Sequence, residues 1–412
     1  METAAPHNRQ RIGRLPRVVR AALWLPVLGV AVLAAVWWAA GPVKPDAFYE
    51  PPTQRPTQPG TLMRSEPFTR AVPRNAQAWR ILYTTTRTDD SSAVASAIVM
   101  IPASASTEPR PVIAWAHGTT GIAPGCAPSL MLHPLTNVPA VDGVISEGWA
   151  VVATDYVGLG TAGGHAYLIG DDAARAVLDA VRAARQLPGL SLDNRVVVWG
   201  HSQGGNAALW VGMRGAGYAA DINLTGIAAL APASDLRELV AAGRSLMFGK
   251  IVSAYLLRAY SAAYPDVKIE DYLLGRASLF AKDIAARCTG EWPTLVSLRE
   301  TAFLPAGGIF SRDPRSGALG ARLLQNTPHE PIGRAPVFIA QGEVDDIVLP
   351  EIQGRFVAAL CAAGQAIDYR VYAGRNHISL LAADSPLSID LIAWTRDRLA
   401  GRPVTATCRP HG

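Results

Sequence analysis

Residues 195–206 of the chain read RVVVWGHSQGGN. The apolar run at 195–199 is typical of a strand buried on both faces of a parallel sheet. The G-x-S-x-G pattern that follows, between a strand and a helix, predicts a tight turn that projects Ser202 from the end of the sheet as a nucleophile. Glycines are expected at 200 and 204, because side chains there would collide with the neighbouring backbone.

Further strand-like and helix-like segments alternate along the chain, which favours an α/β fold with a doubly wound, mostly parallel sheet and helices on both faces. The first two strand-like runs are joined by the polar turn TDDSS and are expected to form a hairpin. The predicted strands are 79–86, 94–101, 111–116, 149–154, 195–199, 225–230, 336–341 and 367–372, and the predicted helices are 170–186, 204–213, 350–363 and 385–399.

About 100 residues between Pro232 and Arg334 contain no convincing strand. Apolar residues recur there at helical spacing, as at Leu236, Leu239 and Val240. We therefore expect a mostly helical insertion at about 235–330, called the cap insertion below, over one end of the sheet. We expect a share of the apolar side chains at 246–260 to line an acyl pocket beside Ser202; the alternative is that all of them pack into the core of this insertion.

A nucleophilic serine needs a base, and the base needs an acid to orient it. In hydrolases of this architecture the chain order is serine, acid, histidine. The loop after strand 336–341 offers Asp345 as the acid, with Asp346 in reserve and Glu343 as a third candidate. The loop before the last helix offers His377 as the base.

An oxyanion that forms during acyl transfer requires two fixed N–H donors. One is expected from Gln203, the residue after the nucleophile. The other is expected from the loop HGTTG that follows strand 111–116, at Thr119. The sequence therefore places both predicted donors at the ends of strands.

Four cysteines are present, Cys126, Cys288, Cys361 and Cys408. Their wide spacing disfavours metal binding and C-x-x-C redox chemistry, and in an exported protein an even number suggests two disulfides. Three connectivities are possible. We favour Cys361–Cys408, because both lie near the late helices, and this leaves Cys126–Cys288.

Cofactors and nucleic acid are not expected. The sequence has no H-E-x-x-H or EF-hand pattern, and its eight histidines are scattered, so we predict no metal. Residues 158–163 match G-x-G-x-x-G, but no acid follows at the end of a next strand, which argues against a nucleotide. Residues 1–20 carry +4 of the net charge of +5, so the other residues together carry only +1. A nucleic-acid-binding protein is expected to be more basic than that.

The N-terminal region predicts export. Residues 1–20 carry five arginines and one acid, and residues 21–43 carry no charge. This pattern predicts a cytoplasmic basic segment followed by a transmembrane signal anchor or a signal peptide. The apolar run is longer than that of most signal peptides, which favours the anchor. The catalytic domain would then be held on the outer side of the membrane, or secreted if the segment is cleaved.

Eight prolines lie between residues 42 and 73. This density excludes helices and central strands, so residues 44–75 are expected to form an extended linker or a strap. Residues 76–412 are expected to form one catalytic domain that contains the cap insertion.

Several motifs together resemble the secretory lipase family, the lipase A-like α/β-hydrolases. They are AWAHGTTGIAPGCAPSL, ATDYVGLGT, GHSQGG, GEVDDIVLP and the late NH pair, and the resemblance spans about residues 47–408. It implies an α/β-hydrolase fold, a helical cap, two disulfides and a triacylglycerol lipase or carboxylesterase that acts on apolar esters. It assigns the nucleophile to Ser202, the acid to Asp345 and the base to His377.

Two other functions remain open at this stage. An acyltransferase would use the same residues with an alcohol in place of water. A membrane-tethered binding protein on an inactive hydrolase scaffold would need none of them, and the presence of all three argues against it.

Overall fold

The structure is a computed structural model that describes residues 17–290, 292–329 and 331–407. It divides into two units between Gly41 and Pro42. The first unit contains helix α1, Arg17–Ala39. The side chains of residues 17–26 lie outside the described part, as do residues 1–16 of the predicted basic segment. In the portion of the chain that is described, no helix has both the length and the hydropathy of a membrane span, so the predicted anchor at 21–43 is not supported there.

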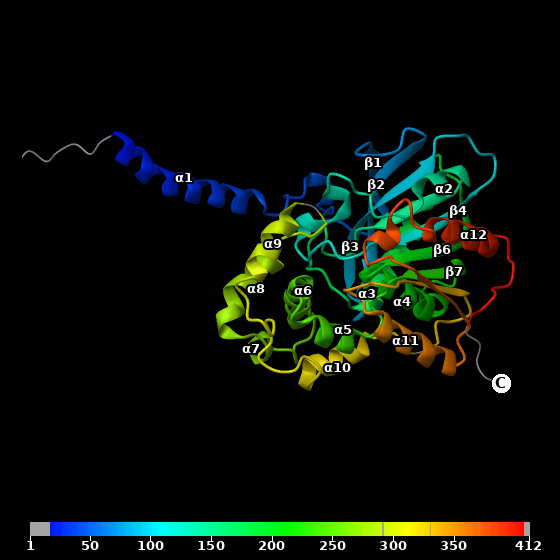
Figure 1. The fold of residues 1–412 in the computed structure, drawn as a ribbon. Helices are drawn as coiled ribbons and strands as arrows, with labels where there is room; N and C mark the ends of the chain where they lie inside the picture. The colour runs from blue at the N-terminus through cyan, green and yellow to red at the C-terminus, as the bar shows by residue number, and fades with distance from the viewer. Residues whose placement is uncertain (1–16, 291, 330, 408–412) are drawn as a thin grey trace, which may run out of the picture. The chain divides into compact units, whose positions relative to one another are not determined.

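The second unit is built on one mixed sheet (Figure 1). Within the described residues its strands lie in the order β1-β2-β3-β5-β4-β6-β7-β8-β9. The strands from β5 to β9 are parallel to one another, and β1, β2 and β3 are antiparallel to their neighbours. Eight of the nine correspond to the predicted strands. Their bounds are β1 Leu62–Phe68, β2 Ala76–Thr86, β3 Ser92–Pro102, β4 Arg110–Ala116, β5 Ala150–Thr154, β6 Leu192–His201, β7 Asn223–Leu230, β8 Val337–Gly342 and β9 Ile367–Tyr372.

Strand β1 corrects the expectation that residues 44–75 form only a linker or strap. Leu62–Phe68 of that segment forms a strand that pairs with β2, and Pro67 lies within the pairing, opposite Trp79. A proline is tolerated here because β1 is the edge strand, so the missing N–H does not interrupt a ladder on both sides.

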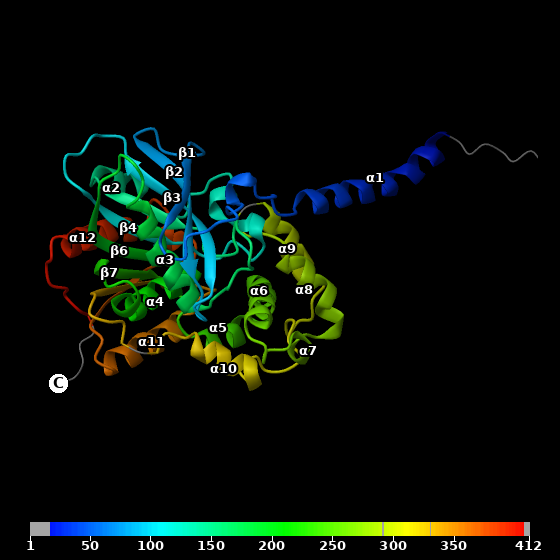
Figure 2. The same cartoon turned by 180° about the vertical axis from the view of Figure 1, so that it is seen from behind.

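Helices cover both faces of the sheet (Figure 2). One face packs against α3 Gly170–Ala184, α4 Gln203–Tyr218 and α11 Pro350–Ala362 through a large apolar cluster. The other face packs against α2 Val141–Ser146 and α12 Leu387–Leu399 through a second cluster. The parallel strands are buried from both sides, which explains their unbroken apolar sequences.

In its described residues, the segment between β7 and β8 consists of helices joined by loops, with one isolated bridge between Leu273 and Phe310. It has its own apolar cluster, which also takes in residues 166–169 of the loop before α3. Its helices are α5 Leu236–Gly243, α6 Met247–Ala263, α7 Ile269–Tyr272, α8 Ser278–Ala285, α9 Pro293–Thr301 and α10 Gly317–Gln325.

Most of the apolar set at 246–260 belongs to the core of the cap insertion. Five of its side chains are at most 1% exposed within that cluster: Ile251, Tyr255, Leu256, Leu257 and Tyr260. Leu246 and Met247 are 46% and 62% exposed. Packing therefore accounts for the first group, and a role in acyl binding remains open for the second.

Candidate active site

Ser202 occupies the turn between β6 and α4 with a strained backbone. Its φ of 57° and ψ of −115° lie outside the regions that side-chain-bearing residues ordinarily adopt. Such a conformation costs about 1–3 kcal/mol and persists only where neighbours hold it. Ser202 N donates to Leu230 O at 2.9 Å, and Ser202 O accepts from Ala233 N at 3.0 Å. The end of β7 therefore fixes the serine in place.

The two glycines of the motif are required by close backbone contacts. A Cβ at Gly200 would lie 1.9 Å from the carbonyl oxygen of Gly204, and a Cβ at Gly204 would lie 1.8 Å from that of Ala116. No side chain fits at either distance, which confirms the reason given for these glycines from the sequence. The turn thus packs directly against the end of β4.

Asp345 and His377 are brought together at the active-site end of β8. His377 Nδ1 donates to Asp345 Oδ2 at 2.8 Å, and each residue is only 3% exposed. Asp345 Oδ1 accepts from the backbone N–H groups of Ile347 and Val348, at 2.9 and 2.8 Å. The carboxylate is thus fixed by the histidine and by two backbone N–H groups, and it leaves His377 Nε2 free.

The reserve acids lie elsewhere. Asp346 and Glu343 are both exposed. Glu343 Oε2 accepts a hydrogen bond from the backbone N–H of Gly374 at 2.9 Å. Only Asp345 of the three bonds to the histidine ring within the described residues.

Two polar side chains that the sequence analysis missed support this pair. Gln341 Nε2 donates to Asp345 Oδ2 at 3.2 Å and to Val348 O at 2.9 Å. His201 Nε2 donates to the carbonyl oxygen of His377 at 3.0 Å, with the two rings 4.5 Å apart. Burial, and then the nearby His377, lower the pKa of His201 well below its usual value, so it stays neutral.

Ser202 Oγ and the His377 ring are not hydrogen-bonded to each other in the described structure, although His201 links the turn to the His377 loop. Such contacts commonly tighten only when substrate binds. The arrangement therefore presents a serine after β6, a buried carboxylate after β8 and a buried imidazole after β9.

The loop after β4 lies beside the serine. A Cβ at Gly118 would lie 3.6 Å from Ser202 Cβ, so this loop runs close to the serine turn. Thr119 follows directly in that loop, and Gln203 begins α4. Thr119 O accepts a hydrogen bond from Thr289 Oγ1 at 3.0 Å. Both predicted oxyanion donors therefore come from segments that adjoin Ser202.

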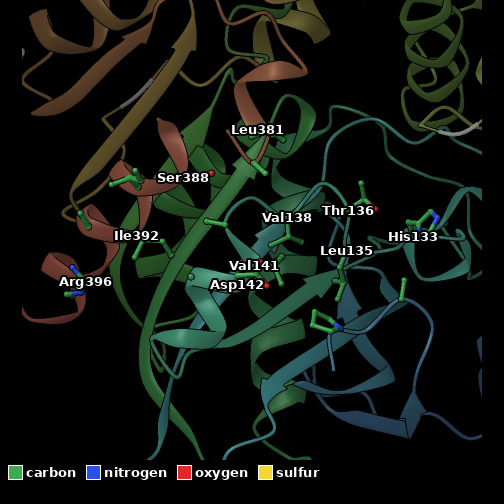
Figure 3. A pocket seen from close by; sticks show the side chains of 17 residues that line it. His133, Leu135, Thr136, Val138, Val141, Asp142, Leu381, Ser388, Ile392 and Arg396 are labelled. Carbon is green, nitrogen blue, oxygen red and sulfur yellow. The ribbon is translucent and has the colours of Figure 1, made fainter. Parts of the chain in front are cut away.

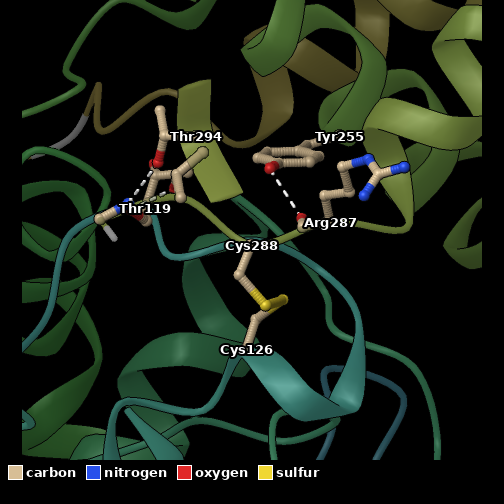
Figure 4. The surroundings of a disulfide bond; sticks show 8 residues. Thr119, Cys126, Tyr255, Arg287, Cys288 and Thr294 are labelled. Atoms are coloured by element: carbon tan, nitrogen blue, oxygen red, sulfur yellow. Dashed lines mark hydrogen bonds between the residues drawn. A yellow bond between two sulfur atoms is a disulfide. The ribbon is translucent and has the colours of Figure 1, made fainter. Parts of the chain in front are cut away.

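A disulfide joins the loop after β4 to the cap insertion (Figure 4). It links Cys126 to Cys288, with their Cα atoms 5.2 Å apart, and confirms this predicted pair. Tyr255 donates to the carbonyl oxygen of Arg287, next to Cys288, at 2.9 Å. Cys408 lies outside the described residues, so Cys361–Cys408 stays a prediction.

A cavity of about 750 Å³ lies between α2 and α12 (Figure 3). Neither Ser202 nor Asp345 nor His377 lines it. Its walls are mainly apolar, and its labelled side chains include His133, Leu135, Thr136, Val138, Val141, Asp142, Leu381, Ser388, Ile392 and Arg396.

Metal ligands are not gathered anywhere in the described ranges. Within residues 17–290, 292–329 and 331–407, no group of three His, Cys, Asp or Glu side chains could hold a metal ion.

Known proteins resemble this chain over most of its length. The model of the family "Secretory lipase" matches residues 136–407. A protein named secreted triacylglycerol lipase LIP3, from Malassezia globosa, is 27% identical over 385 residues, which cover 88% of this chain and 83% of the relative. Lipase A of Moesziomyces aphidis is 25% identical and covers 81% of this chain and 77% of its own length.

Two solved structures share the fold. Candida antarctica lipase A in its closed state has a TM-score of 0.72 and 22% identity, and covers 90% of each chain. The rice cell wall degrading esterase LipA from Xanthomonas oryzae has a TM-score of 0.65 and 20% identity, and covers 84% of this chain and 99% of its own. The second unit therefore has the α/β-hydrolase-like fold of lipase A.

Proposed function

Because the chain belongs to the secretory lipase family, we propose that it hydrolyses carboxylic esters of apolar acids, with Ser202, His377 and Asp345 as its catalytic residues. The observation that carries this proposal is the 2.8 Å hydrogen bond between His377 Nδ1 and Asp345 Oδ2, beside a serine held on a strained turn. The names of its relatives, triacylglycerol lipases and lipase A, support the same class of reaction.

The reaction follows from these positions. Ser202 Oγ attacks the ester carbonyl carbon while His377 Nε2 accepts the serine proton. Asp345 holds the imidazole in the tautomer that leaves Nε2 free, and stabilises the cation that forms. The N–H groups of Thr119 and Gln203 bind the oxyanion. His377 then protonates the departing alcohol.

Water completes the cycle. His377 removes a proton from a water molecule that attacks the acyl-enzyme carbonyl, and the second tetrahedral intermediate collapses to release the free acid and Ser202. An acceptor alcohol in place of water would give a new ester, so the ratio of free acid to ester product measures the competing acyl transfer.

The catalytic unit is proposed to work outside the cytoplasm. The Cys126–Cys288 disulfide supports this, because disulfides persist in oxidising compartments. The word "secreted" in the names of several relatives supports it as well.

The substrate class can be tested with p-nitrophenyl esters of increasing acyl length. Each methylene that enters an apolar site is worth about 0.8 kcal/mol, or roughly a fourfold rise in kcat/KM until the site is full. Ser202→Ala should abolish turnover of every ester. Leu246→Asp and Met247→Asp should lower the gain per methylene if the start of α6 contributes to the acyl site, and an unchanged profile would place that site elsewhere.

A further inference from the structure

The loop between β5 and α3, residues 155–169, is a closed and largely buried structure beside the serine site. A Cβ at Gly158 would lie 2.2 Å from the carbonyl carbon of Gly164, so the two ends of the glycine-rich segment touch. Gly160 N donates to Pro124 O at 2.6 Å, which ties this loop to the loop after β4. Gly158 of the G-x-G-x-x-G pattern therefore serves a close backbone contact, and a Cβ at Gly160 would collide with the ring of Tyr49.

His165 in this loop binds the side chain of Gln203. Its Nδ1 lies 3.1 Å from Val157 O, and because a carbonyl oxygen can only accept, Nδ1 carries the proton. Its Nε2 therefore accepts from Gln203 Nε2, at 2.9 Å. Burial lowers the pKa of His165 to about 3, so the ring keeps this acceptor at neutral pH.

Tyr167 in the same loop binds the side chain of Thr119. The Tyr167 hydroxyl and Thr119 Oγ1 are hydrogen-bonded at 2.8 Å, and Tyr167 is 1% exposed. The Tyr167 ring packs edge-on against Tyr255 of α6, with ring centroids 6.0 Å apart. The ring of Tyr167 therefore packs against the cap insertion, and its hydroxyl bonds to the loop after β4.

We propose that the loop at 155–169 positions both oxyanion donors, with His165 acting through the side chain of Gln203 and Tyr167 acting through the side chain of Thr119. This rests on the proposed function, in which the N–H groups of these two residues bind the oxyanion. The donors come from different elements, the first turn of α4 and the loop after β4. One rigid loop that holds both side chains fixes the spacing between them.

Preorganisation gives this arrangement its catalytic value, because donors that are already aimed at the developing charge need no reorganisation during the reaction. Loss of a whole donor typically lowers kcat by about 10²–10³-fold. Misplacing a donor should cost less, so we expect about a 10–100-fold loss for each connection that is removed. His165 and Tyr167 are positioning residues in this scheme and touch no substrate.

The test uses the full-length chain and a p-nitrophenyl ester. His165→Phe and Tyr167→Phe should each lower kcat with little change in KM. A trifluoromethyl ketone inhibitor forms an oxyanion on the serine, so its binding should weaken by a similar factor in both variants. His165→Gln should recover part of kcat, since its amide oxygen can accept from Gln203. Tyr272→Phe is the matched control, because Tyr272 is 2% exposed and its hydroxyl, among the described residues, bonds to Ser316 O and Leu319 N within the cap insertion.

Double variants separate positioning from general destabilisation. Gln203→Ala should add little to the loss in His165→Phe, and Thr119→Val little to that in Tyr167→Phe, because each pair shares one connection. The proposal is overturned if His165→Phe and Tyr167→Phe keep wild-type kcat and inhibitor affinity, or if they change only in melting temperature as Tyr272→Phe does. It is also overturned if the losses in kcat of the two single variants add up in each double variant. Activity that survives Ser202→Ala would instead refute the proposed function itself.

Discussion

His377 donates its Nδ1 proton to the buried carboxylate of Asp345, whereas the adjacent carboxylate of Asp346 is exposed to solvent. Asp345→Asn should therefore reverse the preferred tautomer of the imidazole and lower kcat by on the order of 10³–10⁴-fold, with little change in melting temperature. Asp346→Asn is the matched control and should retain nearly full activity. Steady-state kinetics of the two variants test this. An inactive Asp346→Asn together with an active Asp345→Asn would show that the acid is misassigned.

The glycine of the serine turn should tolerate no side chain. Gly204→Ala places a Cβ 1.8 Å from the carbonyl oxygen of Ala116, so the turn must move and both activity and stability should fall. Gly217 lies in the same helix with open space around it, and Gly217→Ala should be neutral or should stabilise the protein by up to about 1 kcal/mol. Thermal unfolding and ester turnover of the two variants test this contrast. Equal behaviour would mean that the close contact does not constrain the turn.

The disulfide should contribute strongly to stability because it closes a long loop. Cys126 and Cys288 are 162 residues apart, which in the chain-entropy model is worth about 5 kcal/mol. Non-reducing peptide mapping should recover the Cys126–Cys288 peptide pair, and also a Cys361–Cys408 pair. The Cys126→Ser/Cys288→Ser double variant should unfold at lower denaturant concentration. Four free thiols in the exported protein would contradict both pairings.

A buried carboxylate should make stability depend on pH in an unusual direction. Asp155 accepts hydrogen bonds from Ser96 and Ser129, yet burial raises its pKa to about 6. Between about pH 4 and pH 6, Asp155 therefore binds a proton in the folded protein but not in the unfolded chain. Its contribution to the free energy of unfolding falls as pH rises through that window, by about 3 kcal/mol in total.

Asp155→Asn removes that titration. The free energy of unfolding of the variant minus that of the wild type should therefore increase from pH 4 to pH 6 and stay level above it. The buried neutral histidines, His117 and His165, have lowered pKa values and act in the opposite sense, but they are common to both proteins and cancel in the difference. Urea unfolding at a series of pH values measures it, and a difference that does not vary with pH would refute the shifted pKa.

The serine turn and the strands other than β1 were accessible from the sequence because each has a local signature. The Cys126–Cys288 disulfide has none, and it was predicted only as the pair that remains once the two late cysteines are joined. Buried parallel strands are continuous apolar runs, and the turn at 200–204 has a fixed glycine pattern. Strand β1 was missed because its segment is rich in proline, and only its place at the sheet edge makes pairing possible.

The supporting polar side chains had no such signature. His201 bonds to the backbone of a residue 176 positions away, and Tyr167 bonds to Thr119 across 48 positions. Each is a single residue within a buried segment, so neither periodicity nor spacing distinguishes it from a packing residue. At 246–260, by contrast, the sequence pattern was misleading. Its excess of large apolar side chains suggested a pocket, but five of them pack in the core of the cap insertion.

The central claim, that Ser202 is the nucleophile of an ester hydrolase, is tested most directly by labelling with a p-nitrophenyl phosphonate followed by peptide mass spectrometry. The account predicts one phosphonyl group per chain on Ser202, with activity lost in proportion to labelling, and no labelling of Ser202 when His377 is replaced by Ala. Full inactivation with the phosphonyl group on another residue, or undiminished ester turnover with Ser202 fully labelled, would contradict it.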